Sequence, residues 1–497
     1  MNVWSTRTDR INSGSGVLFK RTTRKAQPAV TQPQEVELAD SRGKYPLAFA
    51  GLYLFTLLMY LRPQEVFPGL FGEVPVVKIV TIGAILVYVV SKLSAGERLI
   101  TWPLEMKMVS VMFVMGVLLT PIAVSPQDSY EILTDTFLKT VLVFILLINL
   151  VDTRARLRLL LGTMVFCEFL FALGGIKTYL AGGYDEAKSF HDRMQGWGTM
   201  FANPNDFASL LDVMLPFVLI FALTRRGWTR PFYFACAGLA VLAVMFTFSR
   251  SGFIGLVAAI SIIIWKLSRG RRLKVLLPAV AIGVVMFMAM PGKYAIRLST
   301  IFNPETDTTN SAQGRQEMMN RAAELAVKRS VVGIGMGNFH IYSVGSMVAH
   351  NSYLETGAEL GIIGLIAYLI VILAPIRSLQ RIERETRPDG AWPEREMYII
   401  SVCLQASLAA YIVYGFFGSV QYLNFLYFTV AYAVTLRRIH SAEIREAAGA
   451  SDGAEAPESH AKARPARGRS WSPRWFRQPW LTRGSRSLVI RRSDGDK

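Results

Sequence analysis

Four side chains that can bind anions or move protons lie in the connections between apolar segments: Arg193, Arg250, Arg315 and His350. An arginine guanidinium stays charged and holds anionic groups through paired hydrogen bonds. A histidine, with an ordinary pKa near 6.5, can serve as a general base at neutral pH. If the fold brings these residues to one face, they predict a site that binds an anionic substrate without a metal.

Arg250 lies in Phe246-Thr-Phe-Ser-Arg-Ser-Gly252, a short turn between two apolar segments. An arginine at or near a membrane costs at least a few kcal/mol unless it has an anionic partner, water or a role. The alternative is an arginine whose long side chain reaches the outer interface.

Arg193 lies in a glycine-rich loop that returns to the membrane through Asn203-Pro-Asn205. Asn205 or Asp206 is expected to cap the following helix. Such a loop can hold an arginine over a central cavity, or it can be an ordinary connection between two spans.

Arg315 opens a helical pattern in which Met319, Ala322 and Ala326 share its face. A cation at the start of a small, apolar face would point at whatever that face covers. The alternative is a solvated arginine on an amphipathic helix.

His350 precedes an apolar segment that begins near Ser352, with Glu355 and Glu359 one and two turns further on. Carboxylates inside a span are candidates for function, and the histidine is a candidate general base. Alternatively, His350 caps the helix or bonds Glu355.

The chain that must position these residues is apolar throughout. It has 497 residues, of which 52% are hydrophobic and only 18% charged, with a mean hydropathy of +0.33. Repeated apolar runs approach the ~20 residues needed to cross a bilayer. The sequence therefore predicts an all-α polytopic membrane protein.

About twelve transmembrane helices are expected. They are Pro46–Tyr60, Val74–Leu93, Leu104–Val124, Leu133–Val151, Leu157–Ala181, Phe207–Leu223, Pro231–Phe248, Gly252–Leu267, Val275–Met290, Tyr353–Ile376, Met397–Phe417 and Tyr422–Leu436.

Lysine and arginine concentrate in alternate connections, such as 154–158, 225–230 and 266–274, whereas 63–73 has neither. The positive-inside rule then places both termini in the cytoplasm. The chain divides into a cytoplasmic disordered arm (1–45), nine helices (46–291), a large periplasmic loop containing a short helix (292–351), three helices (352–438) and a basic disordered tail (439–497).

Charge and motifs exclude several functions. The net charge of +18 lies in short loops and tails, and no nucleic-acid module surrounds the tail, so nucleic acid is not expected as a partner. The tail's mixture of arginine and aromatic residues fits either the anionic lipid surface of the membrane or a solvated segment. The three cysteines form no zinc pattern. Gly333-Ile-Gly-Met-Gly337 lacks the spacing of a nucleotide loop and is interpreted as a turn.

Together these segments resemble the O-antigen ligase and polymerase superfamily of bacterial envelope glycosyltransferases. The resemblance rests on Phe248-Ser-Arg-Ser-Gly252, Gly314-Arg315, Gly333-Ile-Gly-Met-Gly-Asn-Phe339 and the segment from His350 to Gly364, in this order. The Arg193 loop is also similar to the family. One departure is Ser330, where members usually have proline.

The resemblance implies a metal-independent, inverting transferase without a cofactor, in the bacterial inner membrane with its active site facing the periplasm. It would move a glycan from undecaprenyl diphosphate to a hydroxyl of lipid A-core or of a growing polysaccharide. His350 matches the candidate base, and Arg193, Arg250 and Arg315 match the diphosphate-binding arginines. Asn351, Glu355 and Glu359 are expected to support them.

Two alternatives remain open. A transporter or flippase of polyprenyl-linked glycan would bind the same diphosphate without chemistry, although no cations are apparent within the inner halves of the spans. The acceptor could also be a protein hydroxyl, as in protein O-glycosylation.

Overall fold

The computed structural model describes residues 43–61, 69, 76–182, 193–196, 202–268, 273–274, 276–277, 280, 311–386 and 392–454. Within these ranges the regular elements are helices, and no strand occurs. The expected all-helical class is thereby confirmed.

The described elements occur along the chain in a fixed order. They are α1 (Pro46–Leu61), α4 (Val76–Ser94), α5 (Leu104–Leu119), the 3-10 turn η1 (Thr120–Ile122), α6 (Pro126–Glu131), the π-helical η2 (Ile132–Phe137), α7 (Leu138–Leu150), α8 (Arg154–Leu180), α9 (Pro204–Thr224), α10 (Thr229–Phe246), α11 (Arg250–Leu267), α14 (Ser311–Lys328), α15 (Phe339–Tyr342), η4 (Val344–Ser346), α16 (Ser352–Glu385), α17 (Trp392–Gly415) and α18 (Asn424–Ala454).

Eight of the described helices are long and apolar enough to cross a membrane: α4, α5 with η1, α8, α9, α10, α11, α16 and α17. Each coincides with an expected span. α1 is apolar but has only 16 residues, and the expected span Leu133–Val151 is divided between η2 and α7. The last expected span, Tyr422–Leu436, overlaps the first part of α18 from Asn424 onward, and 275–290 lies largely outside the described residues. Multiple spans are confirmed, whereas the number twelve stays a prediction.

The helices alternate in direction, so that one end of the bundle collects the basic connections. We call it the basic end. There α8 begins, and Arg156 donates to the carbonyl oxygens of Lys44 and Leu150 at 2.6 and 2.8 Å. Lys266, near the end of α11, pairs with Glu383 of α16 at 2.6 Å.

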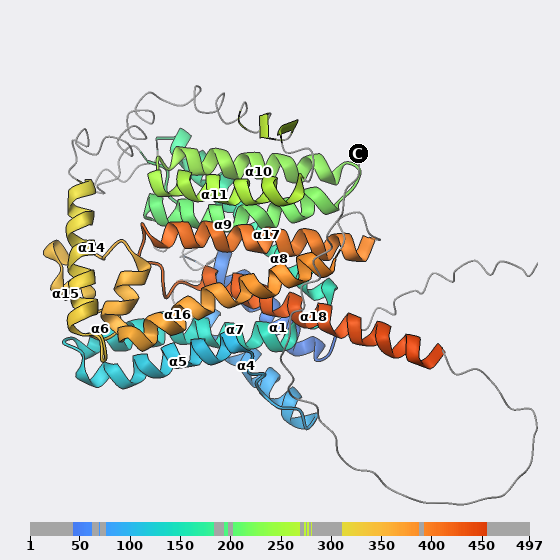
Figure 1. The fold of residues 1–497 in the computed structure, drawn as a ribbon, viewed down its shortest axis with the longest axis horizontal. Helices are drawn as coiled ribbons and strands as arrows, with labels where there is room; N and C mark the ends of the chain where they lie inside the picture. The colour runs from blue at the N-terminus through green and yellow to red at the C-terminus, as the bar shows by residue number, and fades with distance from the viewer. Residues whose placement is uncertain are drawn as a thin grey trace, which may run out of the picture. The chain divides into compact units, whose positions relative to one another are not determined.

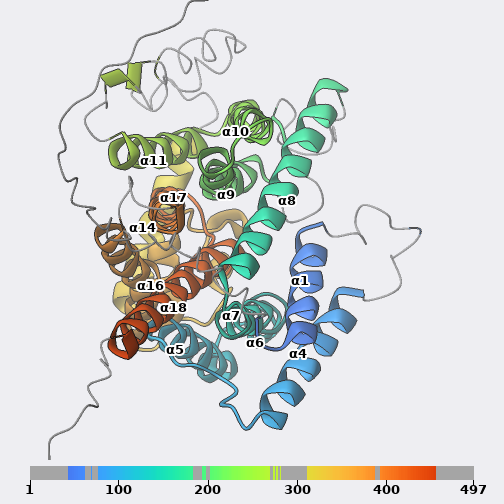
Figure 2. The ribbon, with the colours of Figure 1, turned by 90° about the vertical axis from the view of Figure 1, so that its right-hand side faces the viewer.

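At the opposite end, which we call the site end, α8, α10 and α17 finish and α9, α11 and α16 begin. Figure 1 shows α9, α10, α11, α16 and α17 side by side, with α14 lying across their ends. Figure 2 views several of them along their axes, with α9 and α17 among their neighbours. The sequence-based prediction that α14 is a helix within the polar loop is confirmed.

α9 and α17 form the centre of the bundle. The apolar stretches of these two helices are 89% and 83% buried, and both contact α11. Small residues permit a close approach, as is common where lipid offers no hydrophobic driving force. A Cβ on Gly252 would lie 2.6 Å from Ala208 Cβ. The first turn of α11 is therefore pressed against the first turn of α9, which fixes the position of Arg250.

α16 is interrupted at Gly361, which adopts a positive φ of 68°. The glycine turn fills the interruption, since Ile334 N–H donates to Ala358 O at 2.9 Å and Gly335 N–H to Glu359 O at 3.0 Å. A Cβ on Gly333 would lie 2.3 Å from Glu359 O. The interpretation of this segment as a turn is confirmed, and its glycines allow backbone to pack directly on backbone.

Candidate active site

The loop that carries Arg193 is tied to two neighbouring helix ends. Arg193 is only 6% exposed. Its Nε donates to the carbonyl oxygen of Thr247 at 2.8 Å, and one terminal nitrogen donates to Asn205 Oδ1 at 2.7 Å. Arg193 therefore connects the turn after α10 to the start of α9.

The capping residue of α9 differs from the sequence-based prediction. Asn203, not Asn205 or Asp206, is the N-cap, because its side chain accepts from the N–H of Asn205 at 2.9 Å and Pro204 follows as the first helical residue. Proline suits that position since its missing N–H would be unbonded there in any case. The Asn205 side chain is thereby left to bind Arg193 and Ser249.

Arg250 is the first residue of α11 and follows a strained turn. Phe248 adopts a positive φ of 49°, a conformation that costs a non-glycine residue roughly 1–2 kcal/mol. Ser249 caps the helix, accepting from Gly252 N–H at 3.1 Å and donating to Asn205 Oδ1 at 2.9 Å. Asn205 therefore holds the segments of Arg193 and Arg250 in one network.

Arg315 lies near the start of α14, half-buried on the face that also buries Met318 and Ala322. This face packs on α16, where a Cβ on Gly357 would meet Ala326 Cβ at 3.4 Å. The expected shared face is confirmed, with Met318 more deeply buried than Met319.

The charge of Arg315 acts on three groups from different elements: His350, Asp206 at the start of α9 and Tyr414 at the end of α17. Tyr414 Oη donates to Asp206 Oδ1 at 2.6 Å. The polar-loop helix is thus positioned over the network that contains Arg193 and Arg250. Sequence reasoning considered Asp206 only as a cap and did not include Tyr414, because a tyrosine at the end of an apolar span has no local signature of function.

His350 occupies a left-handed conformation, with φ of 53°, directly before α16. Among the described residues its ring has no hydrogen-bond partner. Burial, followed by the charge of Arg315, lowers the pKa of His350 from 6.5 to about 4. The imidazole is therefore neutral near pH 7, as a proton acceptor must be.

The residues beside His350 fix its backbone. Asn351 caps α16, its Oδ1 accepting from Tyr353 and Leu354 N–H at 3.1 and 3.0 Å. Glu355 accepts from Ala349 N–H at 2.8 Å. The alternatives in which His350 caps the helix or bonds Glu355 therefore do not describe this structure, since Asn351 and the backbone of Ala349 take those positions.

Both buried glutamates of α16 also hold the segment between α17 and α18. Glu355 accepts from Ser419 and from Gln421, the latter at 3.0 Å. Glu359 accepts from Tyr422 Oη at 2.8 Å and from Phe339 N–H at 3.2 Å. Glu355 therefore holds the turn that carries His350, whereas Glu359 joins the end of the glycine turn to the segment between α17 and α18.

α9, α11 and α16 are among the helices that begin at the site end, and hydrogen bonds tie their first turns to neighbouring helices. Asn205 bonds Ser249 between α9 and α11, and Tyr353 Oη of α16 donates to Ile412 O of α17 at 2.8 Å. Helix N-termini present positive dipole ends and favour anions. Of the candidate arginines, Arg315 is the one whose charge acts on the neutral His350.

Fold and site thus define a multi-pass membrane protein with polar, cationic side chains gathered at one end of its helices. Residues 235–369 match the family model described as O-antigen ligase, a range that contains Arg250, Arg315 and His350. Residues 42–200, which contain Arg193, match a family of unknown function. A search of curated proteins finds no match. This match confirms the resemblance to the O-antigen ligase and polymerase family, whose members are in general glycosyltransferases.

Proposed function

We propose that the protein transfers a glycan from undecaprenyl diphosphate to an acceptor hydroxyl at the periplasmic face of the bacterial inner membrane, as an O-antigen ligase or polymerase. The observation that supports this most is the position of Arg315. Its charge acts on His350 and on Asp206, whose neighbour Asn205 binds both Arg193 and Ser249. These contacts support the proposal that the candidate base and the candidate arginines act in one site.

In the proposed reaction the acceptor hydroxyl gives its proton to His350 as its oxygen attacks the anomeric carbon of the donor. The bond from that carbon to the diphosphate oxygen breaks, and its electron pair leaves on the diphosphate. A single displacement inverts the anomeric configuration. Arg250 and Arg315 stabilise the leaving charge through charge-assisted hydrogen bonds. Arg193 holds the Asn205 network in place and adds a third positive charge.

The low pKa of His350 gives the donor a second role. A base with a pKa of about 4 accepts protons poorly. A diphosphate bound to Arg315 would offset the charge that helps to lower this pKa, so donor binding should make His350 more basic. The base would then be strongest when the donor is in place.

The test is complementation of a deletion strain with His350→Asn, Arg250→Gln and Arg315→Gln, with surface glycan as the readout. Asparagine tolerates the left-handed conformation of residue 350 better than alanine does, so His350→Asn separates chemistry from folding. Loss of a general base should slow transfer by about 10²–10⁴-fold.

Arg321→Gln is the matched control, because Arg321 is exposed on the same helix as Arg315 and should retain activity. Normal surface glycan with His350→Asn, at wild-type protein level, would reject the catalytic assignment. If lipid-linked glycan instead accumulates on the cytoplasmic side in the deletion strain, the transporter alternative replaces the transferase.

Mass spectrometry of the lipid-linked glycans in the deletion strain identifies the acceptor class. Single repeat units indicate a polymerase, and long chains indicate a ligase. A protein acceptor would appear as loss of glycan from proteins with lipopolysaccharide unchanged.

The orientation can be tested by cysteine labelling in cells, because the three native cysteines are all buried. Gln313 on α14 and Arg226 at the basic end are both exposed. Gln313→Cys should react with a membrane-impermeant reagent from the periplasm, and Arg226→Cys should not. The reverse pattern would contradict the proposed orientation.

A further inference from the structure

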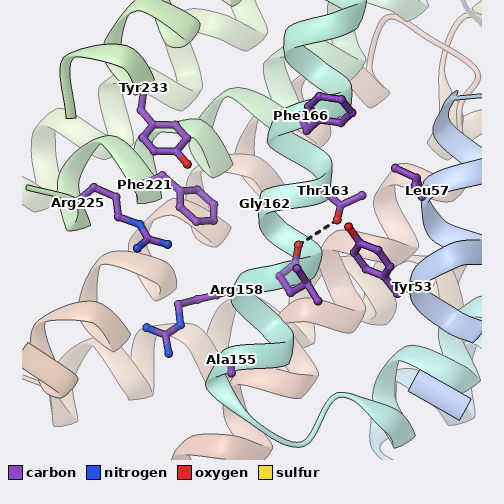
Figure 3. A pocket seen from close by; sticks show the side chains of 11 residues that line it. Tyr53, Leu57, Ala155, Arg158, Gly162, Thr163, Phe166, Phe221, Arg225 and Tyr233 are labelled. Carbon is purple, nitrogen blue, oxygen red and sulfur yellow. Dashed lines mark hydrogen bonds between the residues drawn. The ribbon is translucent and has the colours of Figure 1, made fainter. Parts of the chain in front are cut away.

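An open pocket of about 540 Å³ lies at the basic end, away from the site described above. α1, α8, α9 and α10 contribute its walls. The lining residues are Tyr53, Leu57, Ala155, Arg158, Leu159, Gly162, Thr163, Phe166, Phe221, Arg225 and Tyr233 (Figure 3).

The pocket is polar at one end and apolar along its length. Arg158 of α8 and Arg225, the C-cap of α9, supply positive charge toward the basic end. Leu159 and Phe166 line it with side chains that are 47% and 49% exposed. Exposed apolar side chains beside paired arginines are suited to a ligand with an anionic head and an apolar chain.

The length of the pocket matches the thickness of one leaflet of a bilayer. The α8 residues that line it run from Ala155 to Phe166, about 16 Å at 1.5 Å per residue. The hydrocarbon of one leaflet is about 15 Å thick, half of the ~30 Å core. The arginines lie where headgroups would lie, and Phe166 lies toward the bilayer centre.

The two arginines are held near the pocket by different contacts. Arg225 lies over the ring of Phe221, 5.7 Å from its centroid, and that ring stacks on Tyr233 at 5.3 Å. Arg158 is 3.5 Å from Glu396, which also has Arg154 within 3.9 Å. Arg154 also pairs with Glu443, so these two arginines face two carboxylates. The Arg158 side chain is nevertheless 39% exposed, which leaves its guanidinium accessible to a second anion.

We infer that this pocket binds an anionic phospholipid of the leaflet opposite the candidate active site, with the phosphate between Arg158 and Arg225 and one acyl chain along Leu159 and Phe166. The inference does not depend on the proposed glycosyl transfer. The bound molecule would be a lipid rather than a free phosphate, because Leu57, Leu159, Phe166 and Phe221 give the pocket an apolar surface that a phosphate alone would leave uncovered.

The experiment measures lipid binding to the purified full-length protein by native mass spectrometry and by the rise in its unfolding temperature. Probes are phosphatidylglycerol, phosphatidylcholine with the same acyl chains, and inorganic phosphate. Wild type should bind phosphatidylglycerol more tightly than phosphatidylcholine. Since each arginine near the membrane surface contributes about 1 kcal/mol, the double variant Arg158→Gln/Arg225→Gln should bind it about 30-fold more weakly.

Two further variants separate the head and chain contacts. Arg158→Lys/Arg225→Lys retains the charges and should retain most of the preference for phosphatidylglycerol. Gly162→Leu fills the pocket and should block binding of both lipids. Because leucine favours helix more than glycine does, that change should not weaken α8.

Arg226→Gln is the control, since Arg226 adjoins Arg225, is exposed, and does not line the pocket; it should bind as wild type does. Equal binding of phosphatidylglycerol by all variants would mean only nonspecific lipid around the protein and would overturn the inference. Stabilisation by inorganic phosphate equal to that by the lipid would replace it with a free-anion site. Because lipid binding is measured without glycosyl transfer, failure of this inference is distinguishable from failure of the proposed function.

Discussion

Removing the charge of Arg315 should move the acid limb of the pH–rate profile by a bounded amount. Burial is the larger of the two causes that lower the pKa of His350 from 6.5 to about 4, and Arg315 is the smaller. Arg315→Gln removes only the smaller cause. The acid limb of kcat/KM, near pH 4 in the wild type, should therefore rise but stay below about pH 5.3 in the variant.

The assay is glycan transfer in proteoliposomes with lipid-linked donor, measured from pH 3.5 to 8. In the wild type, kcat describes the enzyme with donor bound, in which the diphosphate offsets the charge of Arg315. The acid limb of kcat should therefore lie at a higher pH than the acid limb of kcat/KM. In Arg315→Gln this separation should shrink, while KM for the donor rises. Arg321→Gln, from the same helix, should leave both limbs in place.

The pH dependence of folding stability should report the protonation of His350 independently of activity. The unfolded chain binds a proton at His350 near pH 6.5 and the folded chain only near pH 4, so folding is favoured above pH 6.5 and loses up to about 3 kcal/mol as the pH falls through this range. His350→Asn removes this loss. The difference in unfolding temperature between variant and wild type should therefore grow as the pH falls from 6.5 to 4.

Two results would refute this reasoning. A wild-type limb of kcat/KM near pH 6.5 would mean that His350 is neither buried nor influenced by Arg315 as the structure has it. An Arg315→Gln limb at or above pH 6.5 would mean that Arg315, rather than burial, dominates.

Two other predictions concern packing. Gly333→Ala should destabilise the protein by about 3 kcal/mol in thermal unfolding, because the new Cβ would lie 2.3 Å from Glu359 O at a residue with positive φ. The control Gly345→Ala has a similar φ but open space around it, so it should cost only about 1 kcal/mol. Equal costs for the two variants would contradict the close packing at Gly333. Arg437→Leu should lower the free energy of unfolding by about 3–5 kcal/mol. The reason is that it leaves the fully buried Glu105, which Arg437 bonds at 2.8 and 2.9 Å, without its partner. Adding Glu105→Gln should restore most of this stability, and no recovery would reject the ion pair as the cause.

Several features of the site are determined by local sequence. The turn at Arg250 could be predicted because Ser249 stands directly between two apolar runs and caps the second of them. The α14 helix and its buried face are predicted by the spacing of Arg315 and Ala322. The family resemblance likewise rests on short segments in order, and the family match includes them.

Other features depend on residues far apart in the chain. The choice of Asn203 over Asn205 as the cap becomes clear only when Asn205 is seen to bind Arg193 and Ser249. No local pattern distinguishes these asparagines.

By itself the sequence determined a multi-pass helical protein with arginines and a histidine in the connections between its spans. Apolar runs and capping residues act over one or two turns, so they are visible in the chain. The tertiary structure decided that Arg315 acts on both His350 and Asp206, and that Glu355 supports the histidine's turn instead of bonding its ring. Burial and electrostatic interaction depend on which elements pack together, and that packing sets the low pKa of His350.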